Sequence, residues 1–183
     1  PRRVGRRRAG TLSPVAVVAE LDAPCAPEVL YAWVDDLDRY PDWLDIVSRA
    51  ERLEDHAGPI RRSEVRVAHD EPEYLDGEPA HDLAAWAIDL RGRLGPLARS
   101  KRLRMVRTVR QHPSAVVFER HELDGREHST WRLSADVEPT ADGARVRMVL
   151  HYGGSLFGPV LERFLRDEIE KSKVRLLALV TEG

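Results

Sequence analysis

An arginine among apolar residues is the side chain of this sequence best suited to chemistry. Arg107 lies in a segment where Leu103, Met105 and Val109 alternate with other residues, so strand alternation points its guanidinium inward with them. A buried guanidinium is costly unless it is paired or faces a polar ligand group. We therefore expect Arg107 either to anchor a carboxylate, phosphate or enolate, or to be turned outward by a bulge near Met105.

Few other polar residues are expected on the inner side of the structure. Glu119 or Glu168 is the expected partner of Arg107. In an enzyme, Arg107 would stabilise an enolate while Tyr152 or a carboxylate passes protons. Ser172 is a further polar candidate. The catalytic candidates are therefore Arg107, Tyr152 and Glu168, and the sequence alone assigns them to no reaction.

Histidine and cysteine provide weaker signals. Cys25 precedes a helix start, where a thiolate is favoured, but no local His or Asn pattern supports nucleophilic catalysis, so we expect a buried inert thiol. Motifs for a nucleophile elbow, a phosphate loop or a dinucleotide fingerprint do not occur. We expect no metal site and no cofactor, because metal-ligand spacing is missing around the histidines considered: His69, His81, His121, His128 and His151.

Arginine is concentrated in two places that we expect to be solvated. Residues 1–10 hold five arginines and no acid, which predicts a disordered basic tail over residues 1–13, although the same charge suits phosphates or anionic lipid. Arg102, Arg104 and Arg110 are expected to share the outer face of a strand. No aromatic residues lie between them to stack on bases. We therefore expect no nucleic-acid partner.

Length and composition favour one globular domain over residues 14–183. The chain has 183 residues, of which 42% are hydrophobic and 33% charged, so it is too apolar to be disordered throughout. No apolar run reaches the roughly 20 residues that a bilayer requires, and no apolar segment follows the N-terminal arginines. We expect a soluble, cytoplasmic protein without integral membrane association. A single cysteine excludes a disulfide within the chain.

The hydropathy pattern predicts the elements that position these residues. Residues 15–22 alternate as a half-buried strand, Pro27 begins a short helix, and a second short helix is expected over residues 37–44. The period then changes to two, which predicts antiparallel strands, with a tight Asp-Gly hairpin turn at residues 124–125. An amphipathic helix over about residues 158–181 is the longest element.

This order predicts an α+β fold, in which a curved antiparallel sheet wraps around a long C-terminal helix and two short helices follow the first strand. Such a sheet cannot enclose one helix without gaps. Large inward side chains therefore either fill the space or line a pocket, and the pattern leaves both possibilities open. These side chains are Trp86, Met105, Phe118, Trp131, Met148 and Tyr152.

Three stretches of the chain resemble the SRPBCC or START-like superfamily, especially its polyketide cyclase/dehydrase and coenzyme-Q-binding-like branch. The first stretch, within residues 29–47, contains Trp33-Val34-Asp35-Asp36-Leu37 and then Arg39-Tyr40-Pro41-Asp42-Trp43. The second is the run of strands with Trp86, Leu94-Gly95-Pro96 and Met105. The third passes from Gly153-Gly154 through Phe157-Gly158-Pro159 into the terminal helix. Together they cover about residues 14–181.

The resemblance implies the helix-grip (START-like) fold with a mainly apolar cavity between sheet and long helix. It implies a hydrophobic small-molecule ligand that is lipid, isoprenoid or polyketide-like. A binding module is the first expectation, and a polyketide cyclase/dehydratase-type enzyme using the same cavity is the alternative. The expected ligand-binding residues are Tyr40, Trp43, Trp86, Ile88, Met105, Arg107, Phe118, Trp131, Met148, Tyr152, Leu165, Ile169 and Ser172.

One segment departs from the family pattern. Residues 60–82 are longer than the family's usual connection, and their second half is acidic. This segment is expected to be a solvated loop, a lid or a surface that binds a protein partner. The acidic residues concerned are Asp70, Glu71, Glu73, Asp76, Glu78 and Asp82.

Overall fold

The computed structural model describes residues 15–54, 84–94, 97–153 and 158–182. In chain order the elements are β1 (Val15–Ala23), α1 (Pro27–Val34), the 3₁₀ helix η1 (Leu37–Arg39), α2 (Tyr40–Trp43), β2 (Val47–Leu53), β3 (Ala85–Leu94), β4 (Leu97–Gln111), β5 (Ala115–Arg120), β6 (Trp131–Thr140), β7 (Gly143–Tyr152) and α3 (Gly158–Glu182). The predicted fold class, a curved antiparallel sheet with a long C-terminal helix and short helices after the first strand, is confirmed.

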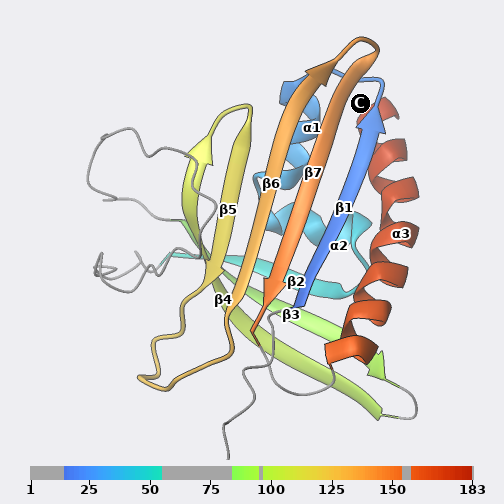
Figure 1. The fold of residues 1–183 in the computed structure, drawn as a ribbon. Helices are drawn as coiled ribbons and strands as arrows, with labels where there is room; N and C mark the ends of the chain where they lie inside the picture. Colours follow the sequence, from blue (N-terminus) through green and yellow to red (C-terminus); the bar gives the residue numbers. More distant parts are fainter. Residues whose placement is uncertain (1–14, 55–83, 95–96, 154–157, 183) are drawn as a thin grey trace, which may run out of the picture.

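Within the described residues, the strands form one antiparallel sheet of seven strands in the order β1-β7-β6-β5-β4-β3-β2. The first and last strands of the chain are neighbours in the sheet. β1 pairs with β7, from Val15 opposite Tyr152 to Ala23 opposite Ala144. Figure 1 shows β3 and β4 running obliquely to β1, β6 and β7, so the sheet is strongly bent. Its inner side faces the helices.

The short helices begin and end where the sequence provides the signals. Pro27 stands at the first position of α1, where its missing N–H costs no hydrogen bond. Asp36 caps η1 by accepting a hydrogen bond from the backbone N–H of Asp38. Pro41 is the second residue of α2, which begins at Tyr40 and ends at Trp43. These three short helices lie against the inner side of the sheet, next to α3 (Figure 1).

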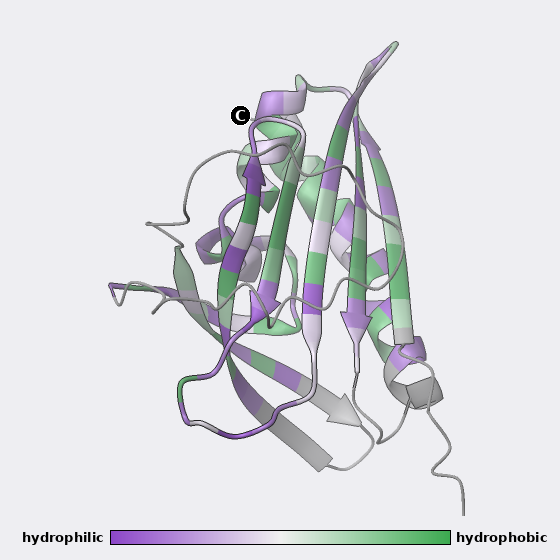
Figure 2. Ribbon diagram, turned by 60° about the vertical axis from the view of Figure 1, so that its left-hand side comes forward, coloured by the Kyte–Doolittle hydropathy of each residue, from purple (hydrophilic) through white to green (hydrophobic). Residues whose placement is uncertain are grey.

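The core lies between the sheet and the helices. Alternating hydropathy along the strands is visible in Figure 2, where green and purple segments succeed one another along β6 and β7. α3 contributes Leu165, Leu176 and Val180 to this core, at the spacing of one helix face. Trp86 and Trp131, with 1% and 8% of their surface exposed, lie inside as predicted.

A bulge in β4 alters the predicted faces of this strand. The pairing with β5 shifts between Arg107, which lies opposite Phe118, and Val109, which lies opposite Val117. The extra residue moves Val109 away from the inner face that Leu103 and Met105 share, and it turns Arg110 inward. The predictions that Val109 points inward and that Arg110 shares the outer face with Arg102 and Arg104 are therefore wrong.

The connection between β5 and β6 also differs from the prediction. Asp124 and Gly125 do not form a two-residue hairpin, because residues 121–130 make a loop that crosses between the strands. β6 begins at Trp131, so the expected strand start at Ser129 is too early. Gly125 has a φ of 70°, which suits the loop. Two side-chain contacts hold the loop: His128 contacts Arg120 at the end of β5, and it contacts Asp124 within the loop.

Several predictions concern residues outside the described part of the chain. These are the basic tail, the segment over residues 60–82 with its acidic half, His69, His81, and part of the stretch that leads into the terminal helix.

The turn between β6 and β7 packs closely on the end of β1 at Gly143, the first residue of β7, and a substitution there tests this contact. Its φ is 152°, and a Cβ at this position would collide with the Ala23 carbonyl oxygen and lie 2.9 Å from the Cys25 backbone nitrogen. We expect Gly143→Ala to lower the free energy of unfolding by at least about 2 kcal/mol in urea titrations. Gly125→Ala, whose Cβ meets nothing within 4 Å, serves as control and should cost about 1 kcal/mol. Equal losses would contradict the argument.

Candidate ligand cavity

A cavity of about 100 Å³ lies between the inner face of the sheet and the helices α2 and α3. Every side chain that lines it is aliphatic, aromatic or a thioether, so the walls offer almost no polar surface to a ligand. The lining residues are Val17, Ala19, Leu37, Tyr40, Trp43, Leu44, Ile46, Val47, Ile88, Leu90, Met105, Trp131, Leu133, Met148, Leu150, Leu165 and Ile169.

Strand alternation places residues from distant parts of the chain on one wall. Val17 and Ala19 of β1 lie opposite Leu150 and Met148 of β7, so all four point to the same side of the sheet. The next strand, β6, adds Trp131 and Leu133 by the same rule. The facing wall comes from α3, where Leu165 and Ile169 are four residues apart on one helix face.

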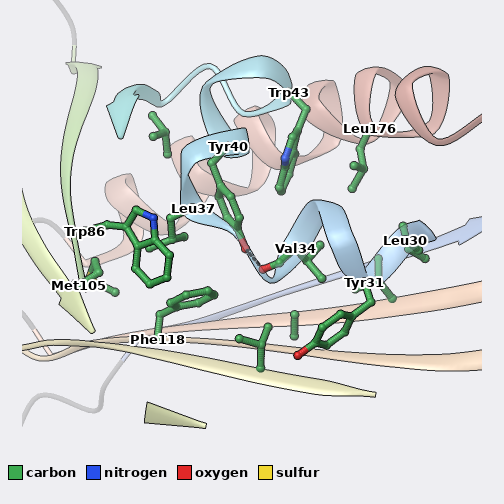
Figure 3. Packing of buried hydrophobic residues seen from close by; sticks show 14 of the residues in the cluster. Leu30, Tyr31, Val34, Leu37, Tyr40, Trp43, Trp86, Met105, Phe118 and Leu176 are labelled. Carbon is green, nitrogen blue, oxygen red and sulfur yellow. Dashed lines mark hydrogen bonds between the residues drawn. The ribbon is translucent and has the colours of Figure 1, made fainter. Parts of the chain in front are cut away.

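Two aromatic residues of α2 form the end of the cavity next to the short helices. The rings of Tyr40 and Trp43 lie 4.8 Å apart, and the Tyr40 hydroxyl donates a 3.0 Å hydrogen bond to the Val34 carbonyl oxygen (Figure 3). Complete burial raises the pKa of Tyr40 well above its usual value. Tyr40 therefore acts as a neutral wall whose proton is already engaged.

Most of the predicted ligand-binding residues meet at this cavity. The structure places eight of them on the lining: Tyr40, Trp43, Ile88, Met105, Trp131, Met148, Leu165 and Ile169. The others, Trp86, Arg107, Phe118, Tyr152 and Ser172, are not among the lining residues.

Four of these others belong to the packed core or to local contacts. Trp86 and Phe118 pack edge to face, with ring centroids 5.6 Å apart, and both are fully buried (Figure 3). The Ser172 hydroxyl donates to the Glu168 carbonyl oxygen one turn earlier in α3. Tyr152 packs against Trp131 from the side, with ring centroids 5.0 Å apart. Inward orientation alone thus did not separate cavity wall from solid core.

Arg107 points inward, as strand alternation predicts, but its partner is Asp35. Its Nη1 lies 3.0 Å from Asp35 Oδ1 and 3.1 Å from the Asp35 carbonyl oxygen at the C-terminus of α1. Arg110 donates to the same carboxylate from Nε and Nη2, at 3.0 and 2.9 Å from Oδ2. The alternative expectation, a bulge near Met105 that turns Arg107 outward, is wrong: the bulge lies after Arg107 and brings Arg110 inward. The carboxylate therefore joins α1 to β4.

The Tyr31 hydroxyl completes this buried network. It donates to Asp35 Oδ1 at 3.2 Å. Burial, followed by the negative charge of Asp35, raises the pKa of Tyr31 to about 12. Tyr31 therefore remains protonated and neutral throughout the physiological pH range, and the network retains its donor.

The two glutamates expected beside Arg107 have other partners. Glu119 lies 3.7 Å from His121 and pairs with Arg132 at 3.2 Å; the contact with His121, followed by the charge of Arg132, holds the pKa of Glu119 below its usual value. Glu168 pairs with Lys171 at 2.7 Å on α3. The prediction that either glutamate pairs with Arg107 is wrong. The catalytic candidates Arg107, Tyr152 and Glu168 do not converge on the cavity.

Cys25 follows β1 and stands as a free thiol. Desolvation raises the pKa of the Cys25 thiol, which disfavours the reactive thiolate. Among the described histidines, burial lowers the pKa of His151, with the nearby charge of Arg132 as a second cause.

Comparison with known protein families assigns this chain to a family. The family model described as "Polyketide cyclase / dehydrase and lipid transport" matches residues 23–176. The chain belongs to this family. The matched range runs from the end of β1 into the last third of α3, and it contains nearly all of the cavity lining.

Solved structures with low sequence identity share the polyketide cyclase fold of this chain. A START superfamily protein from Mycobacterium smegmatis has a TM-score of 0.60 at 12% identity, with 92% of this chain and 98% of that chain covered. A protein from Nitrosomonas europaea has a TM-score of 0.58 at 7% identity, with coverage of 92% and 95%. The predicted helix-grip fold is thereby confirmed.

A larger structural neighbour is the di-domain ARO/CYC protein StfQ from the steffimycin biosynthetic pathway. It has a TM-score of 0.55 at 16% identity, and the match covers 92% of this chain but 50% of StfQ. This chain therefore spans about half the length of StfQ. No curated protein sequence matches this chain. In the described residues, no helix is both long and apolar enough to cross a bilayer.

Several residues that line the cavity were not among the predicted ligand-binding residues. Most of them follow the same strand alternation as the predicted ones. Val17, Leu133 and Leu150 follow the same alternation as Trp131 and Met148, so the inward face of every strand was the available signal. Leu37 lies in η1, where no regular period marks its direction.

The buried Asp35 network provides a test of what holds α1 on the sheet. The Asp35 side chain is 9% exposed and that of Arg107 is 14% exposed, so loss of the charge leaves a poorly hydrated guanidinium. We expect Asp35→Asn to lower the free energy of unfolding at pH 7 by about 3 kcal/mol in urea titrations. The control is Asp22→Asn, which removes the exposed pair with Arg145 and should cost less than about 1 kcal/mol. Similar small losses in both variants would refute a structural role for the network.

Proposed function

We propose that this protein binds a hydrophobic small molecule of lipid, isoprenoid or polyketide-like character in the cavity between the sheet and α3. The observation that carries the proposal is the uniformly apolar lining, supplied by six strands, two short helices and α3 of the described chain. Burial of apolar ligand surface against such walls is favourable by about 25 cal/mol per Å². Membership of the polyketide cyclase / dehydrase and lipid transport family supports the same class of ligand.

The size and the composition of the cavity narrow the class of ligand. Its volume, about 100 Å³, is comparable to apolar cavities of roughly 150 Å³ that bind benzene. The protein in this form suits one ring or a short stretch of chain. Both methionines of the sequence, Met105 and Met148, line the cavity. Their unbranched side chains change rotamer easily, so larger ligands are accommodated by rearranging this wall.

Binding is favoured over catalysis by the positions of the polar groups. A cyclase or dehydratase needs a proton carrier and an oxyanion donor within hydrogen-bond reach of the ligand. Arg107 is engaged by Asp35, and Glu168 pairs with Lys171 on α3. The Tyr40 hydroxyl, although part of a lining residue, donates to a backbone oxygen. We therefore propose a carrier or ligand-binding module.

Reducing the cavity from one wall tests the proposal. Ala19 of β1 lines the cavity, so Ala19→Leu places additional carbon atoms into the free volume. We expect this variant to bind 2-naphthol and 1-decanol at least tenfold more weakly than the unmodified protein in calorimetric titrations, because each buried methylene of ligand that is displaced costs about 0.8 kcal/mol. Native mass spectrometry of protein purified from its own host would identify a co-purifying ligand.

The matched control is Ala16→Leu, three residues earlier on the exposed side of the same strand. This variant should bind both probes like the unmodified protein. If the unmodified protein binds neither probe and never co-purifies with an apolar molecule, the proposed function is wrong.

A further inference from the structure

Lys101 of β4 is an exposed residue next to the cavity lining, and it has no role in the function proposed above. It pairs in register with Leu90 of β3, and Leu90 lines the cavity. Leu103 and Met105 follow it at intervals of two residues, so Lys101 shares their inner face. Its Nζ lies 5.7 Å from the ring centroid of Trp131, another lining residue. A cation is therefore placed over one aromatic wall of an apolar cavity.

The charges around Lys101 leave its ammonium group without a counterion. Arg120 and Glu122 are the charged neighbours, and they pair with each other at 2.6 Å. The Arg120 side chain is only 6% exposed and also donates to the Ser129 carbonyl oxygen. Within the described residues, no hydrogen bond or ion pair reaches Lys101. Desolvation, followed by the positive charge of Arg120, lowers the pKa of Lys101, and the negative charge of Glu122 opposes this shift.

Trp131, whose ring lies next to the Lys101 ammonium, provides a second unused donor. Its side chain is more than nine-tenths buried, and its indole Nε1–H has no hydrogen-bond partner. A buried N–H without an acceptor costs about 1–3 kcal/mol. An oxygen atom of a ligand that reaches the Trp131 end of the cavity would satisfy this donor, and an anionic oxygen would also compensate the charge of Lys101.

We propose that Lys101 and Trp131 bind the anionic head of the cavity ligand, so that the ligand is an amphipathic acid with a carboxylate or similar oxyanion attached to an apolar body. This inference depends on the proposed function, since the apolar body occupies the cavity already described. The sequence suggested Arg107 as the anchor for a polar ligand group. Because Arg107 is paired with Asp35, the proposal assigns this role to Lys101.

Matched pairs of acid and alcohol test the anchor separately from the cavity. Decanoate is compared with 1-decanol, and 2-naphthoate with 2-naphthol, by calorimetric titration at pH 7. The two pairs distinguish a chain-like body from a ring-like body. We expect at least one acid to bind about tenfold more tightly than its alcohol, as a charge-assisted hydrogen bond provides.

Variants of the two donors should alter this preference in different ways. Lys101→Met should reduce the acid-to-alcohol affinity ratio about tenfold, and Lys101→Arg should retain most of it. Trp131→Phe keeps an aromatic wall but removes the N–H, so it should reduce the ratio by a smaller factor. The control is Arg102→Met, one residue along β4, where the side chain is 58% exposed and pairs with Glu51. This control should retain the full ratio.

The outcomes separate the two proposals. If acids and alcohols bind the unmodified protein equally well and Lys101→Met changes neither, the anchor is wrong while the cavity function stands. If neither acid nor alcohol binds, the cavity function fails and the anchor fails with it. Thermal unfolding of each variant identifies losses that are due to misfolding.

Discussion

One long helix has to cover the apolar inner face of a strongly bent sheet, and the described structure follows from this constraint. A straight rod contacts a curved surface along a limited strip, so the remaining apolar surface must be covered by other elements. α1, η1 and α2 cover part of it, and the aromatic pair Tyr40 and Trp43 packs beside α3 (Figure 3). The space that neither the rod nor the short helices fill is the cavity.

A second constraint keeps charge out of that space. Strand alternation points Arg107 toward the C-terminus of α1, and the bulge in β4 turns Arg110 the same way, so the Asp35 carboxylate accepts hydrogen bonds from both. The network fixes α1 on the sheet and also uses the cations that would otherwise lie unpaired on the inner face. Lys101, six residues before Arg107 on the same strand, has no such carboxylate. Arg107 and Arg110 therefore have a structural role, whereas Lys101 is the cation that we propose for ligand binding.

The sequence was informative wherever local periodicity determines direction. The strand over residues 15–22, the start at Pro27, the long terminal helix and the inward positions of Trp86 and Trp131 all follow from spacing of apolar residues. The bulge after Arg107 could not be predicted from this spacing, because one extra residue in a strand changes which side chains share a face without changing the composition. The pairing of Arg107 with Asp35 could not be predicted either, since the two residues are 72 positions apart and meet only in the folded protein. The alternation that drew attention to Arg107 applied equally to Lys101.

The position of α3 beside β1 has a consequence for aggregation. β1 is an edge strand of the sheet, and α3 packs along it (Figure 1). An uncovered edge exposes backbone N–H and C=O groups that recruit strands from other molecules. The helix that covers the cavity therefore also shields this edge from intermolecular pairing. A wide displacement of α3 would expose the edge strand to self-association.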